Sequence, residues 1–180
     1  MFLNRLGLRP NTVTFLGLLG HFVAAYLVIR GNITAGGIVL LFLAPLDFLD
    51  GTLARLRGES SRFGAFIDSV TDRYSEFVIL GSLLVYYLNQ GNSLGSILVY
   101  LTAAGSILVS YIRARAESLE FEARVGFLSR VERYIILIPC LIFNLPIYGL
   151  WFLAIFTNFT ALQRIVHVRQ QAYQAGSEGE

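Results

Sequence analysis

The sequence contains no lysine, a single cysteine and few charged residues of any kind. Charged residues make up 14% of the 180 residues and hydrophobic residues 55%, and all 14 basic charges are arginine. A soluble domain of this length would be more charged and less apolar. The lone Cys140 excludes an internal disulfide, and its apolar surroundings indicate a small core residue. We therefore expect an integral membrane protein.

Apolar runs of about 20 residues, the length that crosses a bilayer, recur along the chain. They predict an all-α integral membrane fold with six transmembrane helices, at roughly 12–30, 34–56, 62–88, 94–118, 130–144 and 147–168. Residues 1–9 are amphipathic and predict a short N-terminal helix lying in the membrane interface. The predicted domains are this interfacial helix (1–9), the six-helix domain (10–169) and a polar, disordered tail (170–180).

Arginine decides the predicted orientation. Six spans place both termini on one side of the membrane, and all arginines except Arg30 fall on that side. Segments rich in basic residues stay in the cytoplasm. We therefore expect a multi-pass protein of the cytoplasmic membrane, with both termini facing the cytoplasm.

Aspartate is also scarce, and all four aspartates fall within residues 47–72. Asp47 and Asp50 are three residues apart, and Asp68 and Asp72 are four apart, so each pair lies on one face of a helix. The sequence GESS at 58–61 predicts a break that turns the two pairs toward each other. Carboxylates at the edge of hydrocarbon are costly and usually functional. Four of them suit one or two hard divalent cations, Mg²⁺ or Mn²⁺.

Small residues and one arginine accompany the aspartates. Gly51, Ala54 and Gly64 leave room for a flat ligand or for close backbone approach. Arg55 follows Asp50 by just over one turn, and a guanidinium beside a metal site suits a phosphate group. The stretch therefore predicts a site for a metal ion and a phosphorylated ligand that opens toward the cytoplasm.

These residues form the pattern D-x2-D-G-x2-A-R-x8-G-x3-D-x3-D, which resembles the signature of the CDP-alcohol phosphotransferase family at every fixed position. The resemblance implies transfer of a phosphatidyl group from CDP-diacylglycerol to an alcohol, with release of CMP. It implies that Asp47, Asp50, Asp68 and Asp72 hold the metal and that Asp72 is the general base. The positions it implies for the CDP-lipid are Pro10, Asn11, Thr12, Val13, Gly51, Ala54, Arg55, Ser61 and Gly64. A homodimer is expected, and no nucleic-acid partner.

Three further arginines, Arg113, Arg133 and Arg164, each sit near the cytoplasmic end of a different predicted span. They could form an anion pocket, or they could reflect topology and snorkelling alone. SYIRARAE at 110–117 and the following G-x3-R-x2-R resemble the branch that makes phosphatidylinositol phosphate and its archaeal ether-lipid equivalent. That resemblance implies that the three arginines bind the acceptor phosphate. Arg113 stands where a lysine is common.

Several functions remain open at this point. The preferred acceptor is a small phosphorylated polyol, inositol 1-phosphate, and glycerol 3-phosphate is the alternative for the same chemistry. Carboxylates inside a helix bundle also carry ions across membranes, so a divalent-cation carrier is a distant alternative. A non-catalytic lipid-binding protein is a third, although an intact signature argues against it.

Overall fold

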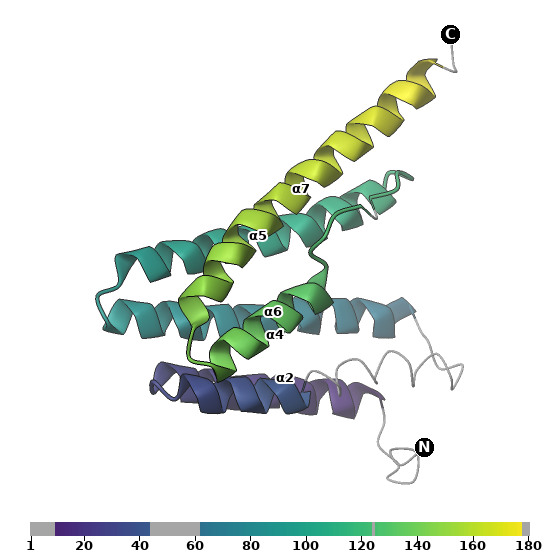
Figure 1. The fold of residues 1–180 in the computed structure, drawn as a ribbon. Coiled ribbons are helices and arrows are strands. Elements are labelled where there is room, and N and C mark those ends of the chain that lie inside the picture. The colour runs from purple at the N-terminus through teal and green to yellow at the C-terminus, as the bar shows by residue number, and fades with distance from the viewer. Residues whose placement is uncertain (1–9, 44–61, 124, 178–180) are drawn as a thin grey trace. The chain divides into compact units, whose positions relative to one another are not determined.

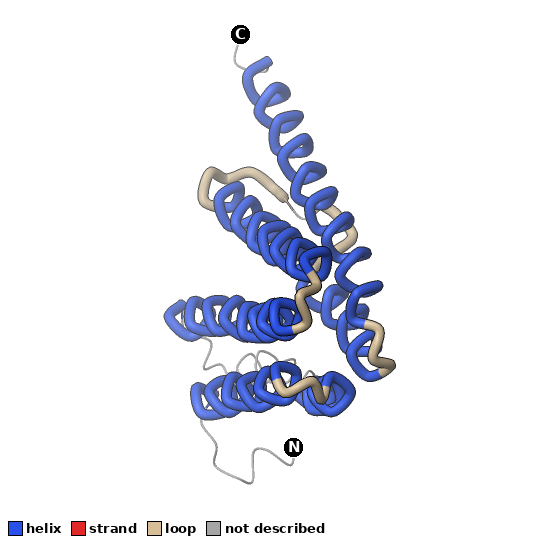
Figure 2. The backbone as a smooth tube through the Cα atoms, turned by 90° about the vertical axis from the view of Figure 1, so that its left-hand side faces the viewer, coloured by secondary structure: helices blue, strands red, loops and turns tan. Residues whose placement is uncertain are grey.

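The computed structural model describes residues 10–43, 62–123 and 125–177, with side chains from residue 17 to residue 174 within these ranges. The described residues form six helices and no strand (Figures 1 and 2). The helices are α2 (Pro10–Ile29), a helix over Ile33–Leu43, α4 (Arg62–Asn89), α5 (Ser93–Glu117), α6 (Arg130–Ile142) and α7 (Pro146–Ser177). The all-α prediction is confirmed.

The helix starts follow local chemistry. α2 begins at Pro10 and α7 at Pro146, because proline needs no backbone donor in the first turn of a helix. Asn92 caps α5, where its Oδ1 accepts a hydrogen bond from the Gly95 N–H at 2.9 Å. The predicted spans 12–30, 62–88, 94–118 and 130–144 therefore agree with α2, α4, α5 and α6 to within about two residues.

The chain divides into two compact units. Unit 1 comprises residues 1–91 and 141–144. In it α2 packs against α4, and Thr34 Oγ1 donates a hydrogen bond to the Ile142 carbonyl at 3.0 Å. Apolar burial stabilises this packing. The fully buried apolar side chains of α2 and α4 include Ala24, Val28, Ile79 and Leu83.

Unit 2 comprises residues 92–140 and 145–180, and α5 packs along α7 within it. The two helices approach closely at Gly105, where an added Cβ would lie 2.8 Å from Thr157 Cβ. Polar side chains join them as well: Asn158 Nδ2 donates to the Leu101 carbonyl at 3.1 Å. Small residues and side-chain hydrogen bonds of this kind are typical of helix pairs in a bilayer.

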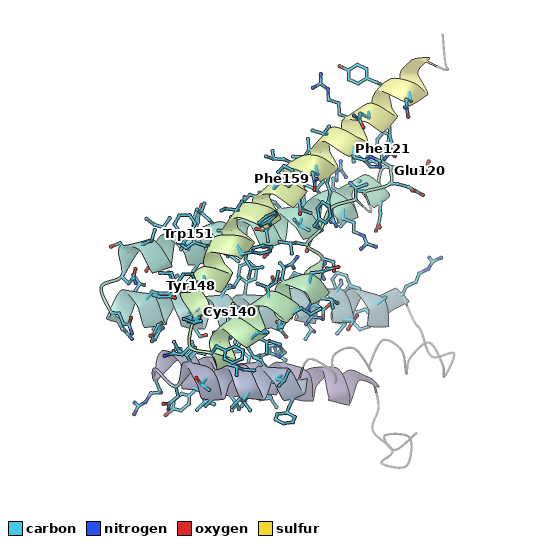
Figure 3. All side chains as sticks on the ribbon, in the orientation of Figure 1. Glu120, Phe121, Cys140, Tyr148, Trp151 and Phe159 are labelled. Carbon is cyan, nitrogen blue, oxygen red and sulfur yellow. The ribbon has the colours of Figure 1, made fainter. Side chains whose placement is uncertain are left out.

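Two described helices are long and apolar enough to cross a membrane, α5 and residues Pro146–Gln174 of α7. Large apolar side chains on α7 point outward, among them Tyr148, Trp151 and Phe159 (Figure 3). Because water would not favour so much exposed apolar surface, these faces suit lipid. The remaining predicted spans stay predictions.

The end of α7 corrects one prediction. The last span was expected to end near residue 168, and a disordered tail was expected from residue 170. The helix instead continues to Ser177. Residues 164–175 contain no glycine or proline, and their arginine, glutamine and alanine residues favour helix. The side chain of Gln171 also holds a neighbouring backbone segment, as described below.

Candidate functional site

α4 carries two of the four predicted metal ligands. Gly64, Asp68 and Asp72 follow one another at intervals of four residues within α4, so they share one face of the helix. This confirms the predicted placement of the Asp68–Asp72 pair. The Asp72 side chain is 21% exposed, and both carboxylates are only partly buried. Their oxygens are therefore within reach of a cation from outside the helix.

Arg73 follows Asp72 on α4 and forms an ion pair with it. Its Nη1 lies 3.9 Å from Asp72 Oδ2, the outer limit of an ion pair, and donates a hydrogen bond to the Ser69 carbonyl at 2.8 Å. The guanidinium is thus bound mainly to backbone. A partly exposed pair at this distance contributes little to stability. Arg73 is therefore a weak ion-pair partner for Asp72.

Much of the predicted metal and nucleotide site lies outside the residues that the structure describes. Asp47, Asp50, Gly51, Ala54, Arg55 and Ser61 fall outside the described residues, and of Pro10, Asn11, Thr12 and Val13 only the helical backbone is described. Within residues 10–43, 62–123 and 125–177 no three His, Cys, Asp or Glu side chains gather to hold a metal. The site with four carboxylates therefore stays a prediction, of which the structure supplies the half on α4.

The sequence reasoning missed one carboxylate beside this pair. Glu76 follows Asp72 by four residues on α4 and is partly buried. Each step of four residues turns about 40° around the helix, so Glu76 lies next to Asp72 and about 80° around the helix from Asp68. Its spacing was a visible signal. The aspartate signature ends at Asp72 and does not include Glu76.

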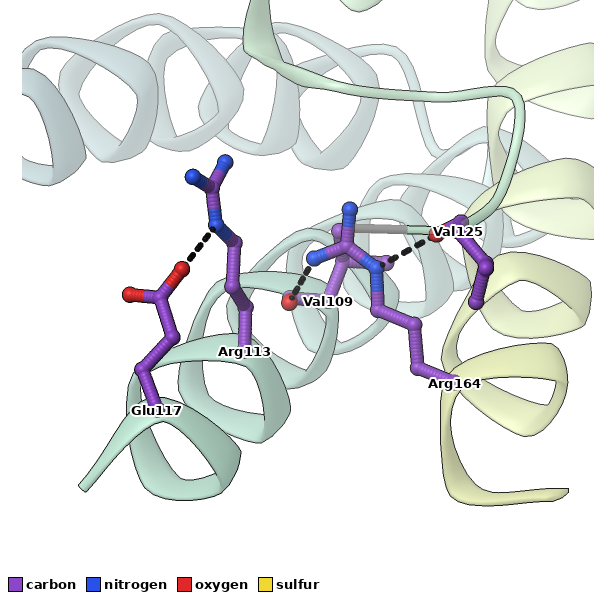
Figure 4. A network of polar contacts seen from close by, with 5 residues as sticks. All are labelled: Val109, Arg113, Glu117, Val125 and Arg164. Atoms are coloured by element: carbon purple, nitrogen blue, oxygen red, sulfur yellow. Dashed lines mark hydrogen bonds and ion pairs between the residues drawn. The ribbon is translucent and has the colours of Figure 1, made fainter. Parts of the chain in front are cut away.

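The three predicted acceptor arginines all belong to unit 2. Arg113 lies in the last turns of α5, Arg133 in the first turn of α6, and Arg164 in α7. The charges of Arg113 and Arg133 both act on Arg164, so both side chains lie near it. Figure 4 shows the Arg113 and Arg164 side chains extending to the same side of α5. The structure therefore brings these residues together.

Arg164 is buried and held by two backbone carbonyls. Its side chain is 5% exposed, Nε donates to the Val125 carbonyl at 2.9 Å, and Nη1 donates to the Val109 carbonyl at 2.6 Å (Figure 4). Carbonyl oxygens fix the plane of the guanidinium but carry no net charge. These two hydrogen bonds therefore orient the positive charge of Arg164 without neutralising it.

Arg133 resembles Arg164, and Arg113 differs from both. Arg133 is buried, and its Nη1 donates to the Leu128 carbonyl at 3.2 Å. Arg113 is half exposed and pairs with Glu117, with Nε and Oε1 2.9 Å apart. Glu117 also attracts Arg164. The Glu132 carboxylate interacts with Arg133. A cluster with three positive charges and two carboxylates still keeps an excess of positive charge, which attracts a phosphate monoester.

The family model for CDP-alcohol phosphatidyltransferases matches residues 8–166. The chain belongs to this family and is a transferase. It is 35% identical to the phosphatidylinositol phosphate synthase of Streptomyces avermitilis, over 97% of this chain and 78% of that protein. It is 36% identical to the archaetidylinositol phosphate synthase of Pyrococcus horikoshii, over 92% of this chain and 86% of that protein.

Solved structures agree with these sequence relationships. The crystal structure of phosphatidylinositol phosphate synthase from Mycobacterium tuberculosis with CDP-DAG bound matches with a TM-score of 0.82 and 33% identity, over 92% of this chain and 89% of that one. The structure of the same enzyme in complex with manganese and citrate matches with a TM-score of 0.83, also at 33% identity, over 92% and 85%. The chain thus shares the fold of a phosphatidyltransferase that binds a CDP-lipid.

Proposed function

We propose that the protein transfers the phosphatidyl group of CDP-diacylglycerol to a hydroxyl of a small phosphorylated polyol, preferably inositol 1-phosphate, and releases CMP. The observation that carries this proposal is the convergence of Arg113, Arg133 and Arg164 in unit 2. An uncharged alcohol such as inositol would leave these charges without an anion. Two of the arginines are buried, which surface topology alone does not require.

The names of the relatives support the same acceptor. Enzymes named as phosphatidylinositol phosphate and archaetidylinositol phosphate synthases are 35% and 36% identical to this chain. The arginine cluster by itself fits any phosphate monoester, so glycerol 3-phosphate is the alternative acceptor. Membership in a transferase family argues against the cation carrier and the non-catalytic alternative.

The metal is Mg²⁺ or Mn²⁺, as one or two ions, held by Asp47, Asp50, Asp68 and Asp72. The fit rests on hard oxygen donors and on the shared, partly exposed face of Asp68 and Asp72. Manganese in the structure of a relative supports it. Such a metal neutralises charge on the transferring phosphoryl group and on the leaving CMP.

The remaining roles fall to side chains of this chain. Asp72 takes the proton from the acceptor hydroxyl as that oxygen attacks the lipid-side phosphorus. Arg55 binds the pyrophosphate, and the other expected contacts with the CDP-lipid are Pro10, Asn11, Thr12, Val13, Gly51, Ala54, Ser61 and Gly64. The protein works as a homodimer with six spans per chain in the cytoplasmic membrane. Its termini and active site face the cytoplasm.

The test is release of CMP from CDP-diacylglycerol by the purified full chain in detergent with Mg²⁺. Inositol 1-phosphate, glycerol 3-phosphate, inositol and serine are offered separately. Turnover with inositol phosphate alone supports the proposal. Turnover with glycerol 3-phosphate alone keeps the chemistry but replaces the acceptor. Turnover with a free alcohol only would contradict the phosphate-binding role of the arginines.

A further inference from the structure

We propose that Gln171, on the C-terminal part of α7, is a positioning residue for the acceptor-phosphate site. It holds the connector, residues 118–129 between α5 and α6, and the carbonyls of this connector orient Arg164 and Arg133. The inference rests on the proposed function for the identity of the ligand. The contacts that carry it all lie within unit 2.

Gln171 binds both backbone polar groups of one connector residue. Its Oε1 accepts a hydrogen bond from the Glu122 N–H at 2.9 Å, and its Nε2 donates to the Glu122 carbonyl at 2.6 Å. The two residues are 49 positions apart in the sequence. A side-chain amide that pairs with the N–H and the C=O of one residue in this way mimics the pairing of a neighbouring strand. It therefore sets both the position and the direction of the connector at Glu122.

Two further residues of α7 contact the connector along the same face. Arg164 reaches the Val125 carbonyl, and Thr160 lies against Gly126. Positions 160, 164 and 171 differ by four and seven, so they share one face of α7. Connector residues 122, 125 and 126 meet them in reverse order. The connector therefore runs back along α7 on its way from α5 to α6 (Figure 1).

The course of the connector depends on Gly126 as well. Its φ is +107°, a conformation that side chains with a Cβ rarely adopt, and an added Cβ would collide with Thr160 Cγ2. Ala123 and Leu128 on either side are fully buried. The connector is thus closely packed between Glu122 and the start of α6.

This arrangement links Gln171 to the two buried arginines. The Val125 carbonyl accepts from Arg164 Nε, and the Leu128 carbonyl accepts from Arg133 Nη1. Glu122 is three residues before Val125, so a shift of the connector at Glu122 moves the acceptor that orients Arg164. Bidentate recognition of phosphate depends on the direction of the guanidinium as well as its charge. Gln171 acts through the connector and carries no charge of its own.

The alternative is that Gln171 only stabilises the end of α7. The two roles differ in what a substitution does to the two substrates. Loss of a positioning contact weakens binding of the phosphorylated acceptor and leaves the CDP-lipid unaffected. Loss of general stability would lower the amount of active enzyme, and so the maximal rate, while both KM values stay the same.

The experiment compares Gln171→Leu with Gln170→Leu in the full chain. Gln170 is the adjacent, exposed residue of the same type, so it is a matched control for composition and helix position. Acceptor KM is measured with inositol 1-phosphate, or with glycerol 3-phosphate if that is the acceptor used. Hydrogen exchange of connector amides is followed by mass spectrometry.

For Gln171→Leu we expect faster exchange around Glu122 and an acceptor KM raised roughly threefold to tenfold, the size of one or two lost neutral hydrogen bonds. The KM for CDP-lipid stays within twofold.

Several results would overturn the proposal. Equal acceptor KM values in the two variants, with an active wild-type enzyme, refute the positioning role and leave the proposed function intact. A parallel rise in both KM values, or unchanged exchange around Glu122, refutes it as well. A wild-type enzyme that turns over no phosphorylated acceptor refutes the proposed function, and the role of Gln171 at an acceptor-phosphate site falls with it.

Discussion

Arg113 and Glu117 form an ion pair on the last turn of α5, with Nε and Oε1 2.9 Å apart. Both side chains are about half exposed, so water screens the pair and it contributes little to the stability of the helix. The ion pair matters because Arg113 belongs to the proposed acceptor-phosphate site, together with Arg133 and Arg164. Arg113 bonds to the Glu117 carboxylate, whereas the described hydrogen bonds of Arg133 and Arg164 run to backbone carbonyls. Glu117 therefore competes with an acceptor phosphate.

Substitution Glu117→Gln should strengthen acceptor binding. The neutral amide no longer holds Arg113 by charge, and the positive charge felt by the phosphate increases. We expect the acceptor KM to fall about twofold to threefold at low salt, the size of an exposed ion pair, and less at high salt. Initial rates of CMP release measure this. Glu120→Gln, which removes the same charge from the exposed connector, is the control. An acceptor KM that rises in Glu117→Gln would show that Glu117 assists binding.

The arginines should also differ in their tolerance to lysine. Arg164 bridges two carbonyls through Nε and Nη1, and a lysine ammonium cannot span both. Arg164→Lys should raise the acceptor KM about tenfold or more, because it loses a charged hydrogen bond in a buried site. Arg113→Lys should stay within roughly threefold of wild type, since Arg113 is exposed and makes no contact with a backbone carbonyl in the described structure. Similar effects of the two substitutions would contradict this division of roles.

Much of the fold could be predicted because its determinants are local. Apolar run length, proline at helix starts and the asparagine before α5 mark helix bounds directly. The pairing of Asp68 with Asp72 follows from spacing on one helix, and the structure confirms it. The facing pair, Asp47 and Asp50, lies outside the described residues, so its role remains an expectation from the signature.

The features that could not be predicted depend on contacts between distant segments. The C-terminal part of α7 looks like a polar tail in the sequence because residues 170–174 lack apolar periodicity. Gln171 is nevertheless bound to the backbone of Glu122, 49 residues away. The difference between Arg164 and Arg113 is likewise invisible in sequence, where both are arginines at helix ends. Only the packing of α5 against α7 buries one and leaves the other exposed.

Asp72 and Glu76 are neighbouring carboxylates on α4, and they should respond very differently to neutralisation. Asp72→Asn removes the proposed base and a metal ligand while keeping the shape, so CMP release should fall by at least about 100-fold. Glu76→Gln should retain activity within roughly fivefold, because Glu76 lies outside the aspartate signature. Rates are compared across a Mn²⁺ titration. A Glu76→Gln variant as inactive as Asp72→Asn would add Glu76 to the metal site.

The contact of α5 with α7 at Gly105 gives a test of unit 2 packing. An alanine Cβ there would lie 2.8 Å from both Thr157 Cβ and Asn158 Nδ2. Rotation of the threonine side chain cannot move its Cβ, so the helices must separate. Gly105→Ala should therefore cost about 1–3 kcal/mol of stability and lower the midpoint of thermal unfolding in detergent.

Gly81 on α4 provides the matched control for this substitution. An added Cβ at Gly81 meets nothing within 4 Å, and its backbone is helical. Gly81→Ala should leave the unfolding midpoint unchanged or raise it, because alanine favours helix by about 0.5–1 kcal/mol over glycine. If Gly105→Ala unfolds at or above the wild-type midpoint, α5 and α7 do not approach as closely as described. The orientation of Arg164 through the Val109 carbonyl of α5 would then need another explanation.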